Sequence, residues 1–503
     1  MKKAFFKIHP LLVAIFPILA LRNHNIIYVD FGSIVRSLIL ALLLAGIIWA
    51  VLTVVIKNSD RSGLITSVVM ILFFSYNQIY LQFQTAFGFE LRHRYLVLIF
   101  GAVLVGLSVL ILRLRNAAVL QQVLTVTGAV MVVFAVAQSA VYDINKSFVD
   151  AQARDQSKKQ LAPIALSNSQ MSELPDIYLI ILDAHTRSDI LKDHYNLDNS
   201  DFIQGLQNLG FYVAPCSQSN YAFTNYSLTS LMFMDYLHHF TDMFALPSLS
   251  ESTVIQTLKS LGYTTIRFEN NVGAHLTIGE GITLSRKKFV FGNFDLTGGP
   301  NEFEAELFQT TFLKLFYDLP QLVPGFDPTS LDKTEYYEHF AQTHFILDDL
   351  KNVPGMEGPK FVMVHILVPH VPYIFTPDGE FQITNDSVAG YRNNVAFIDS
   401  AILPAVKDVI AQTKRPLIII IQGDHGPIGT KISPEMRMSI LDAYYVNAET
   451  KTSLYGTITP VNSFRIIFNH YFGYNLPLLE DTSYYSLKQA KLDDLKVVPN
   501  TCK

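Results

Sequence analysis

Four long apolar segments without a single charged residue constrain the fold of this chain more than any other feature. They are Ser37–Ile56, Ser62–Phe89, Tyr95–Leu112 and Ala117–Val141. Each has about 18 or more residues, which is enough for a helix to cross a bilayer core of about 30 Å. Four buried core helices in succession would need a large partner to cover them. We therefore predict an α-helical membrane domain over residues 1–145.

The composition of the whole chain agrees with a membrane-anchored protein. Hydrophobic residues make up 50% of the 503 residues and charged residues 16%, whereas about 25% charged is usual in soluble domains. The net charge of −5 is spread along the chain, and no basic stretch indicates nucleic-acid binding. The two cysteines, Cys216 and Cys502, form no CxxC zinc pair. They can pair with each other outside the cytosol, but the sequence alone does not decide this.

A shorter apolar segment, Ile8–Leu21, precedes these four and contains Pro10 and Pro17. Because lysines stand ahead of it, a secretory signal peptide is the competing interpretation. Arg22 directly after it, and the lack of a small-residue cleavage site, favour a membrane helix. We therefore expect about five membrane helices.

Basic residues in the loops predict the orientation. With five spans and the N-terminus inside, seven lysines and arginines fall on the inner side and four on the outer side, which agrees with the positive-inside rule. An odd number of spans then places everything after Tyr142 outside the cytoplasm. The inner residues are Lys2, Lys3, Lys7, Lys57, Arg61, Arg113 and Arg115, and the outer ones are Arg22, Arg36, Arg92 and Arg94.

The rest of the chain has the pattern of a soluble α/β domain over residues 173–503, after a polar helical extension and linker over 146–172. Three apolar runs read as buried parallel strands, since they lack polar alternation. Helical patterns lie between them, so we expect a sheet with helices on both faces. The strands are Asp176–Leu182, Phe361–Val368 and Pro416–Gln422, and the helices include Ser188–His194, Asp201–Leu209, Ser252–Leu261 and Asn393–Thr413.

Carboxylates and imidazoles follow these three strands. Asp183 ends the first, His365 and His370 belong to the second, and Asp424 and His425 end the third. An Asp-His pair alone is as often a helix cap as a metal site. In open α/β sheets, however, bound ligands lie at the carboxyl ends of the strands. Asp183, Asp424 and His425 suit a zinc or manganese ion that leaves a fourth position for a reacting oxygen.

Thr224 can supply that oxygen. It lies in SNYAFTNYSLTSLM, at or just before the first turn of a helix predicted over Ser227–Phe240. Taken alone, Thr224 reads as a helix N-cap. A hydroxyl at a helix N-terminus, however, also stands where a phosphate would bind, and a divalent metal beside it would favour attack on phosphorus.

The two histidines of VHILVPHVPY have different interpretations. His365 alternates within a strand, so a core histidine with a satisfied nitrogen is as good an interpretation as a substrate-binding one. His370, between Pro369 and Pro372 just past the strand end, is harder to explain structurally. We expect it to donate a hydrogen bond to a phosphoryl oxygen or a proton to a leaving group.

Taken together, these stretches resemble the membrane-anchored sulfatase-like hydrolases and transferases of the alkaline-phosphatase superfamily, related to lipoteichoic acid synthases and phosphoethanolamine transferases. The resemblance covers about residues 173–480, and the order and spacing of the motifs make it specific. The matching stretches are PDIYLIILDAHTR, GFYVA, SNYAFTNYSLTSLM, HILVPHVPY, QGDHG and TPVNSFRIIFNHYFG.

The resemblance implies a mixed sheet with helices on both faces and one divalent metal, zinc or manganese. It implies that Asp183, Thr224, Asp424 and His425 bind this metal, and that Thr224 carries a phospho-threonine intermediate. The implied enzyme transfers a phospho-head group, of phosphoethanolamine or phosphoglycerol type, from a phospholipid to a glycan or lipid-linked acceptor. His370, with His365, would bind the phosphoryl group. The catalytic domain would face away from the cytoplasm, on the bacterial inner membrane.

Several departures from the family pattern bear on the reaction. The sulfatase CxPSR signature is absent, and Cys216 lies eight residues before Thr224. The first acidic ligand is Asp183 where the lipid-head-group transferases use Glu, and HVPY replaces their HGP. The paired cysteines of many phosphoethanolamine transferases are missing. A membrane-bound phosphodiesterase, phosphatase or sulfatase-like hydrolase, and a catalytically inactive membrane scaffold, are the alternatives.

Overall fold

The structure is a computed structural model. It describes residues 7–27, 29, 31–87, 93–161, 174–238, 240, 246–269, 276–279, 281–286, 301–315, 329–429, 431–486, 492 and 494–502. The chain divides into two compact units. One comprises Met1–Asn145 and Lys287–Glu335, and the other comprises Lys146–Arg286 and Tyr336–Lys503.

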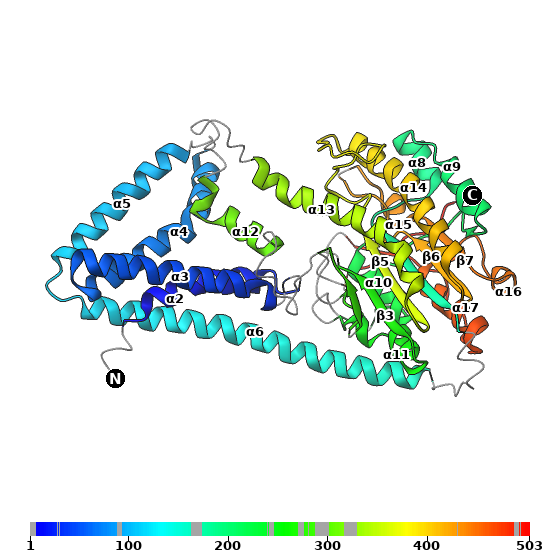
Figure 1. Ribbon diagram of the computed structural model, residues 1–503, viewed down its shortest axis with the longest axis horizontal. Coiled ribbons are helices and arrows are strands. Elements are labelled where there is room, and N and C mark those ends of the chain that lie inside the picture. The colour runs from blue at the N-terminus through cyan, green and yellow to red at the C-terminus, as the bar shows by residue number, and fades with distance from the viewer. Residues whose placement is uncertain are drawn as a thin grey trace. The chain divides into compact units, whose positions relative to one another are not determined.

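The first unit is built from apolar helices (Figure 1). Four of them, α3, α4, α5 and α6, are long and apolar enough to cross a membrane. Their surfaces expose large aliphatic and aromatic side chains, such as Leu98 (70%) and Phe134 (62%), as expected of helices whose partner is lipid rather than water. The prediction of a multi-helix apolar N-terminal domain is confirmed. The helices are α2 (His9–His24), α3 (Phe31–Ile56), α4 (Ser59–Phe87), α5 (His93–Arg113) and α6 (Ala118–Gln160).

The segment predicted as a fifth span forms α2, which has 16 residues and contains Pro17. It is shorter than the other four, but it packs among them: Ala14 and Ile18 are fully buried in one cluster with side chains of α3, α4 and α6. α2 is therefore an integral part of this helical unit.

Residues 287–335 group with the N-terminal helices. The sequence instead predicted one continuous catalytic domain over residues 173–503. Helix α12 (Glu302–Thr310) starts with a capping box, in which Asn301 and Glu304 each accept from the other's backbone N–H. Glu304 also forms an ion pair with Arg36 of α3, and Asn301 donates to the Ser33 carbonyl at 2.9 Å. These contacts join a segment from the middle of the chain to the helical unit.

The expected linker over 146–172 is partly helix. α6 continues to Gln160, and its last turns belong to the second unit. There Arg154 forms an ion pair with Glu251, and the Ser157 hydroxyl donates to the Glu251 carbonyl at 2.7 Å. The helical extension is therefore fixed to the α/β unit, while residues 162–172 lie outside the described residues.

The second unit contains a seven-stranded mixed sheet in the order β2-β7-β6-β1-β5-β3-β4. β6, β1, β5, β3 and β4 are parallel neighbours, and β7 pairs antiparallel with both β6 and β2. The strands are β1 (Asp176–Leu182), β2 (Tyr212–Val213), β3 (Thr264–Phe268), β4 (Ile282–Leu284), β5 (Lys360–Ile366), β6 (Leu417–Gln422) and β7 (Asp442–Tyr445), and a separate pair comprises β8 (Tyr484–Tyr485) and β9 (Lys496–Val497).

Alternate side chains of the buried strands enter two cores, one on each face of the sheet. In β1, Ile177, Leu179 and Ile181 pack with α10, α11 and α17, whereas Tyr178, Ile180 and Leu182 pack with α9, α14 and η5. This two-sided burial explains why the strands read as continuous apolar runs. The helices are α8 (Ser188–Tyr195), α9 (Ser200–Asn208), α10 (Thr224–Phe233), α11 (Thr253–Ser260), α13 (Thr329–Asp349), α14 (Ser387–Gln412), α15 (Pro434–Met438), α16 (Ala448–Lys451) and α17 (Pro460–Phe472), with 3-10 turns η2 (Leu249–Glu251) and η5 (Leu350–Gly355).

The helix predicted over Ser227–Phe240 is wrong at both ends. α10 begins at Thr224 and ends at Phe233, because Met234 adopts a left-handed conformation with φ of 54°. The Asp235 N–H then bonds back to the Ser230 carbonyl at 3.2 Å. Such a left-handed residue closes a helix even where the following residues are apolar.

Candidate active site

The three strands that carry the predicted residues are neighbours in the sheet, in the order β6-β1-β5. Their register aligns the carboxyl ends, since Leu182 pairs with Ile366 and Ile181 with Gln422. Two hydrogen bonds from backbone N–H groups join the loops that follow these three strands. The Ala184 N–H donates to Asp424 Oδ1 at 3.0 Å, and the His370 N–H donates to the Asp183 carbonyl at 3.0 Å. The sheet thus brings the predicted residues of all three loops together.

Asp183 and Asp424 each have a carboxylate oxygen within 4 Å of the His425 imidazole. The His425 Nε2 atom lies 3.6 Å from Asp183 Oδ1 and 3.4 Å from Asp424 Oδ2. Both carboxylate oxygens are buried and have no hydrogen-bond partner among the described residues. His425 Nδ1 lies 2.9 Å from the Gly426 carbonyl, so Nδ1 carries the donated proton. Burial, then the charge of Arg437, lowers the pKa of His425 to about 4, and the neutral ring turns its Nε2 lone pair toward the carboxylates.

This donor set fits a divalent cation. Two buried carboxylate oxygens that have no partner in the described part of the chain lie close to one imidazole lone pair. These groups repel one another unless a positive charge lies between them. Ligand atoms of Asp183, His365 and Asp424 all lie within 4.8 Å of one another, as do those of Asp183, His370 and His425. Carboxylate oxygens with imidazole nitrogens are the ligands that zinc and manganese accept.

His365 supports Asp183 from within the sheet. Its Nε2 atom lies 3.1 Å from Asp183 Oδ2, and both side chains are buried. Burial alone would lower the pKa of His365, but the hydrogen bond and charge of Asp183 outweigh it and raise the pKa. In turn, His370 and His365 hold the pKa of Asp183 below its usual value despite burial. His365 is therefore a core residue that contacts a candidate metal ligand, and its role in substrate binding stays a prediction.

Thr224 is the first residue of α10, and Phe223 is the N-cap, so the N-cap interpretation of Thr224 is wrong. Its Oγ1 atom lies 3.3 Å from His425 Nε2. The hydroxyl is the donor in this contact, since Nε2 carries the lone pair. The loop before α10 is joined to the metal-binding loop, because the Ser219 hydroxyl donates to the Asp424 carbonyl at 2.6 Å. The helix thus places a hydroxyl beside the candidate metal ligands.

His370 lies at the open side of the site. Its Nδ1 atom donates to the Val371 carbonyl at 2.7 Å, so Nε2 is left for other partners. The ring centroid lies 6.1 Å from that of His425. His370 is half-buried, unlike the fully enclosed Asp424, so its imidazole can reach a group that enters from solvent.

Arg437 is a site residue that sequence reasoning missed. It is 8% exposed and lies on α15, whose start is capped by the Ser433 hydroxyl. Its guanidinium donates to the Ala222 carbonyl at 2.8 Å and to the Gly426 carbonyl at 3.0 Å. Burial lowers its pKa to about 10, so it stays charged at neutral pH. No local pattern in EMRMS distinguishes this arginine, because its role comes only from the loops it joins.

Comparison with known proteins identifies the family. A sulfatase family model matches residues 175–460. No curated protein matches the chain. Similar solved structures include the C-terminal periplasmic domain of EptC from Escherichia coli, with 13% identity over 67% of this chain and 96% of that chain (TM-score 0.41).

Two further similar structures come from the lipooligosaccharide phosphoethanolamine transferase A of Neisseria meningitidis. Its soluble domain shows 13% identity over 59% of this chain and 87% of that chain (TM-score 0.36). The integral membrane protein shows 13% identity over 89% of each chain (TM-score 0.34). The family match covers more than half of the chain and confirms the relationship predicted from the motifs: this protein belongs to the sulfatase family of enzymes.

Proposed function

We propose that this enzyme transfers a phospho-head group from a phospholipid to a glycan or lipid-linked acceptor through a phospho-Thr224 intermediate. One observation carries the proposal: Thr224 Oγ1 lies 3.3 Å from His425 Nε2, beside two buried carboxylate oxygens that lack partners among the described residues. A hydroxyl beside a cation site at a helix N-terminus suits attack on phosphorus.

Asp183, Asp424 and His425, with the Thr224 oxygen, would hold the divalent metal, zinc or manganese. When bound, such an ion supplies positive charge that favours ionisation of a neighbouring hydroxyl and neutralises phosphoryl oxygens. His365 fixes the orientation of Asp183 from behind. A ligand held by such a partner binds more tightly than an unsupported one.

The side chains divide the transfer into two steps. Thr224 would enter the reaction as an alkoxide whose hydroxyl proton has passed to solvent, and it would leave in the same form. Its Oγ1 atom forms a bond to phosphorus, and the bond from phosphorus to the glycerol oxygen of the lipid breaks. His370, as an imidazolium, donates its Nε2 proton to the departing diacylglycerol oxygen. The neutral His370 then accepts a proton from the acceptor hydroxyl, whose oxygen attacks phosphorus and releases Thr224. Arg437 holds the Gly426 and Ala222 carbonyls, and thereby fixes the loops of His425 and Thr224.

Exposed apolar side chains beside the site support a lipid donor. Val371 directly follows His370 and is 42% exposed, and Ile428 lies three residues after His425 and is 39% exposed. Because the His370 and His425 rings lie 6.1 Å apart, the two loops border the same site. We take Val371 and Ile428 to form an aliphatic rim of the site, which favours a substrate with an acyl portion over a fully polar one.

A disulfide supports an extracytoplasmic location of the α/β unit. Cys216 and Cys502 are bonded to each other. Disulfides persist in oxidising compartments and are rare in the cytosol. This agrees with the orientation expected from the loop charges, in which α6 ends outside the cytoplasm of a bacterial inner-membrane protein.

Mass spectrometry after incubation with a lipid extract tests the proposal. We expect the wild-type peptide that contains Thr224 to gain the mass of the head-group phosphoryl, and the Thr224→Ala enzyme to gain none and to lose turnover. An acceptor-dependent product identifies a transferase. Release of the head-group phosphate into water without acceptor identifies a hydrolase instead. Unchanged turnover by the Thr224→Ala enzyme would contradict the proposal.

A further inference from the structure

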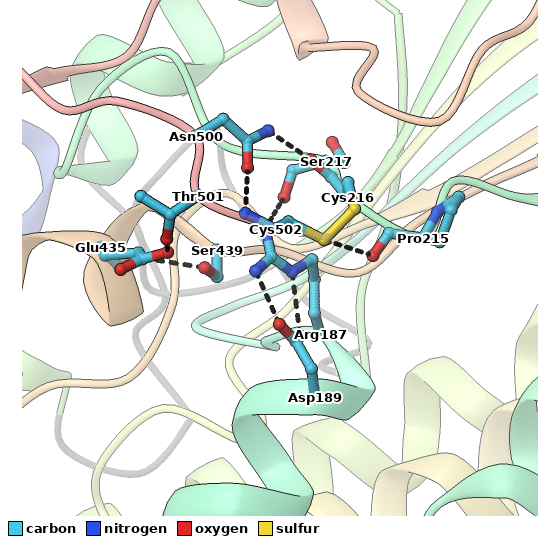
Figure 2. Close-up of a disulfide and its surroundings, with 10 residues drawn as sticks. All are labelled: Arg187, Asp189, Pro215, Cys216, Ser217, Glu435, Ser439, Asn500, Thr501 and Cys502. Atoms are coloured by element: carbon cyan, nitrogen blue, oxygen red, sulfur yellow. Dashed lines mark hydrogen bonds and ion pairs between the residues drawn. A yellow bond between two sulfur atoms is a disulfide. The ribbon is translucent and has the colours of Figure 1, made fainter.

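The C-terminal tail, defined here as residues 483–486 and 494–502, is covalently attached to the segment that leads into the nucleophile helix. Cys502 bonds to Cys216 across a sequence separation of 286 residues, with the Cα atoms 5.5 Å apart. Figure 2 shows Asn500 and Cys502 lying against Pro215, Cys216 and Ser217. We call residues 216–223 the nucleophile segment, since Thr224 follows it directly.

The tail contacts the nucleophile segment along its length. The Asn500 side chain donates to the Cys216 carbonyl at 2.7 Å (Figure 2). The Ser483 hydroxyl donates to the Ser219 carbonyl at 2.8 Å, and the Tyr484 N–H donates to the Asn220 carbonyl at 2.9 Å. Further along, Val498 of the tail packs against Ala222 and Met438 in one buried cluster, joined by Phe223 and Tyr485.

Groups of the active-site loops hold the same segment. The Ser219 N–H donates to the Met438 carbonyl at 2.7 Å, and its hydroxyl donates to the Asp424 carbonyl. Arg187, which binds both carboxylate oxygens of Asp189, also donates to the Ser217 carbonyl at 3.3 Å (Figure 2). The segment therefore binds the metal-binding loop as well as the tail.

We propose that the C-terminal tail and its disulfide position the nucleophile, in that they hold the nucleophile segment against the Asp424 loop and fix Thr224 Oγ1 in reach of the phosphoryl group. This inference rests on the proposed function. The tail and the nucleophile segment lead to Thr224, whereas the other three candidate metal ligands, Asp183, Asp424 and His425, lie outside both. Loosening the tail therefore displaces the nucleophile and leaves the carboxylate and imidazole ligands in place.

Two adjacent valines of the tail provide a matched pair. Val498 is 8% exposed and faces the nucleophile segment, whereas Val497 is 62% exposed. In the full-length protein, with bis(p-nitrophenyl) phosphate as the probe, we expect Val498→Ser and Cys502→Ser to lower kcat roughly ten- to a hundredfold, because a displacement of about 1 Å has that effect on a positioned group. KM and bound metal should stay within twofold, and Val497→Ser should behave like the wild type.

Reduction gives the same test without a substitution. Tris(2-carboxyethyl)phosphine should lower the kcat of the folded wild type to the Cys502→Ser level and leave Cys502→Ser itself unchanged. The proposal is overturned if kcat is unaffected in all of these cases, or if it falls only in parallel with metal loss or unfolding. If Val498→Ser fails to fold, the reduction of the wild type still tests whether the disulfide positions the nucleophile.

Hydrogen exchange separates this inference from the proposed function. If the wild type turns over no phosphodiester, the proposed function fails, but the positioning remains measurable. Reduction should then still raise deuterium uptake in a peptide covering residues 217–226, with no change in the peptide that contains Asp424. Unchanged uptake in the first peptide would refute the positioning by itself.

Discussion

The Nε2 atom of His425 lies 3.3 Å from the Thr224 hydroxyl oxygen, although 201 residues separate them in the chain. The same nitrogen faces the buried oxygens of Asp183 and Asp424 at 3.6 and 3.4 Å. A nucleophile, two carboxylates and an imidazole lone pair thus lie close together.

Removing one carboxylate should remove the metal. We expect Asp424→Asn to lower the bound zinc or manganese at least tenfold, because a neutral amide replaces a charged ligand. Elemental analysis of the purified protein measures this directly, without an activity assay. Asp408→Asn is the matched control, since Asp408 is exposed on α14. Stoichiometric metal in Asp424→Asn would exclude Asp424 as a ligand.

Arg437→Lys should impair catalysis while keeping the positive charge. The single ammonium nitrogen of lysine cannot reproduce the planar fork in which Arg437 donates from Nε to the Ala222 carbonyl and from Nη1 to the Gly426 carbonyl. We expect kcat to fall about tenfold with bound metal retained, because a small displacement of the loops that carry Thr224 and His425 misplaces the reacting groups. Exposed Arg392 of α14 provides the control for the same substitution. Equal kcat values for both variants would show that Arg437 contributes only charge.

The apolar rim should matter for lipid substrates alone. Val371→Ser and Ile428→Ser should each raise KM for a phospholipid in vesicles roughly fivefold, which corresponds to about 1 kcal/mol of lost apolar burial. Hydrolysis of water-soluble bis(p-nitrophenyl) phosphate should not change. Leu478→Ser is the control, since Leu478 is 46% exposed outside these two loops. A matching loss on both substrates would mean that the rim does not contact the acyl portion.

Asp442 should make the stability of the protein fall as pH rises. Burial raises the pKa of Asp442 to about 8, despite hydrogen bonds from the Tyr444 and Ser217 hydroxyls. Its Oδ1 atom has no partner among the residues that the structure describes. Between the ordinary carboxyl pKa and about pH 8 the folded state holds a proton that the unfolded state has lost, so raising the pH across this range favours unfolding.

The Asp442→Asn variant tests whether ionisation of Asp442 lowers the stability of the folded protein as the pH rises. Asparagine keeps an acceptor for Tyr444 and cannot ionise, so we expect its unfolding midpoint to exceed that of the wild type at pH 8.5 and to match it closely at pH 5. Thermal unfolding at both pH values provides the measurement. An equal difference between the two proteins at both values would indicate that Asp442 stays ionised when folded.

Much of the fold follows from local patterns. Long uncharged segments can only be satisfied as helices in an apolar surrounding, and runs such as Asp176–Leu182 can only be buried on both sides. The predicted strands agree with the structure to within two residues at each end. The ligand-type residues were recognisable because they follow these strands, and the carboxyl ends of parallel neighbours meet at one edge of the sheet.

The remaining features are set by the backbone conformation of single residues or by contacts between distant parts of the chain. Thr224 is the first helical residue rather than a cap, and α10 stops at Phe233, because backbone geometry at Phe223 and Met234 sets both ends. The membrane-type helices, the sheet and the residue types at its edge could thus be predicted from the sequence, since they depend on local periodicity. Three features became visible only in the folded chain: the pairing of Cys216 with Cys502, the grouping of residues 287–335 with the N-terminal helices, and the contacts of Arg437. In each case folding brings distant partners together, and no local pattern in the sequence indicates them.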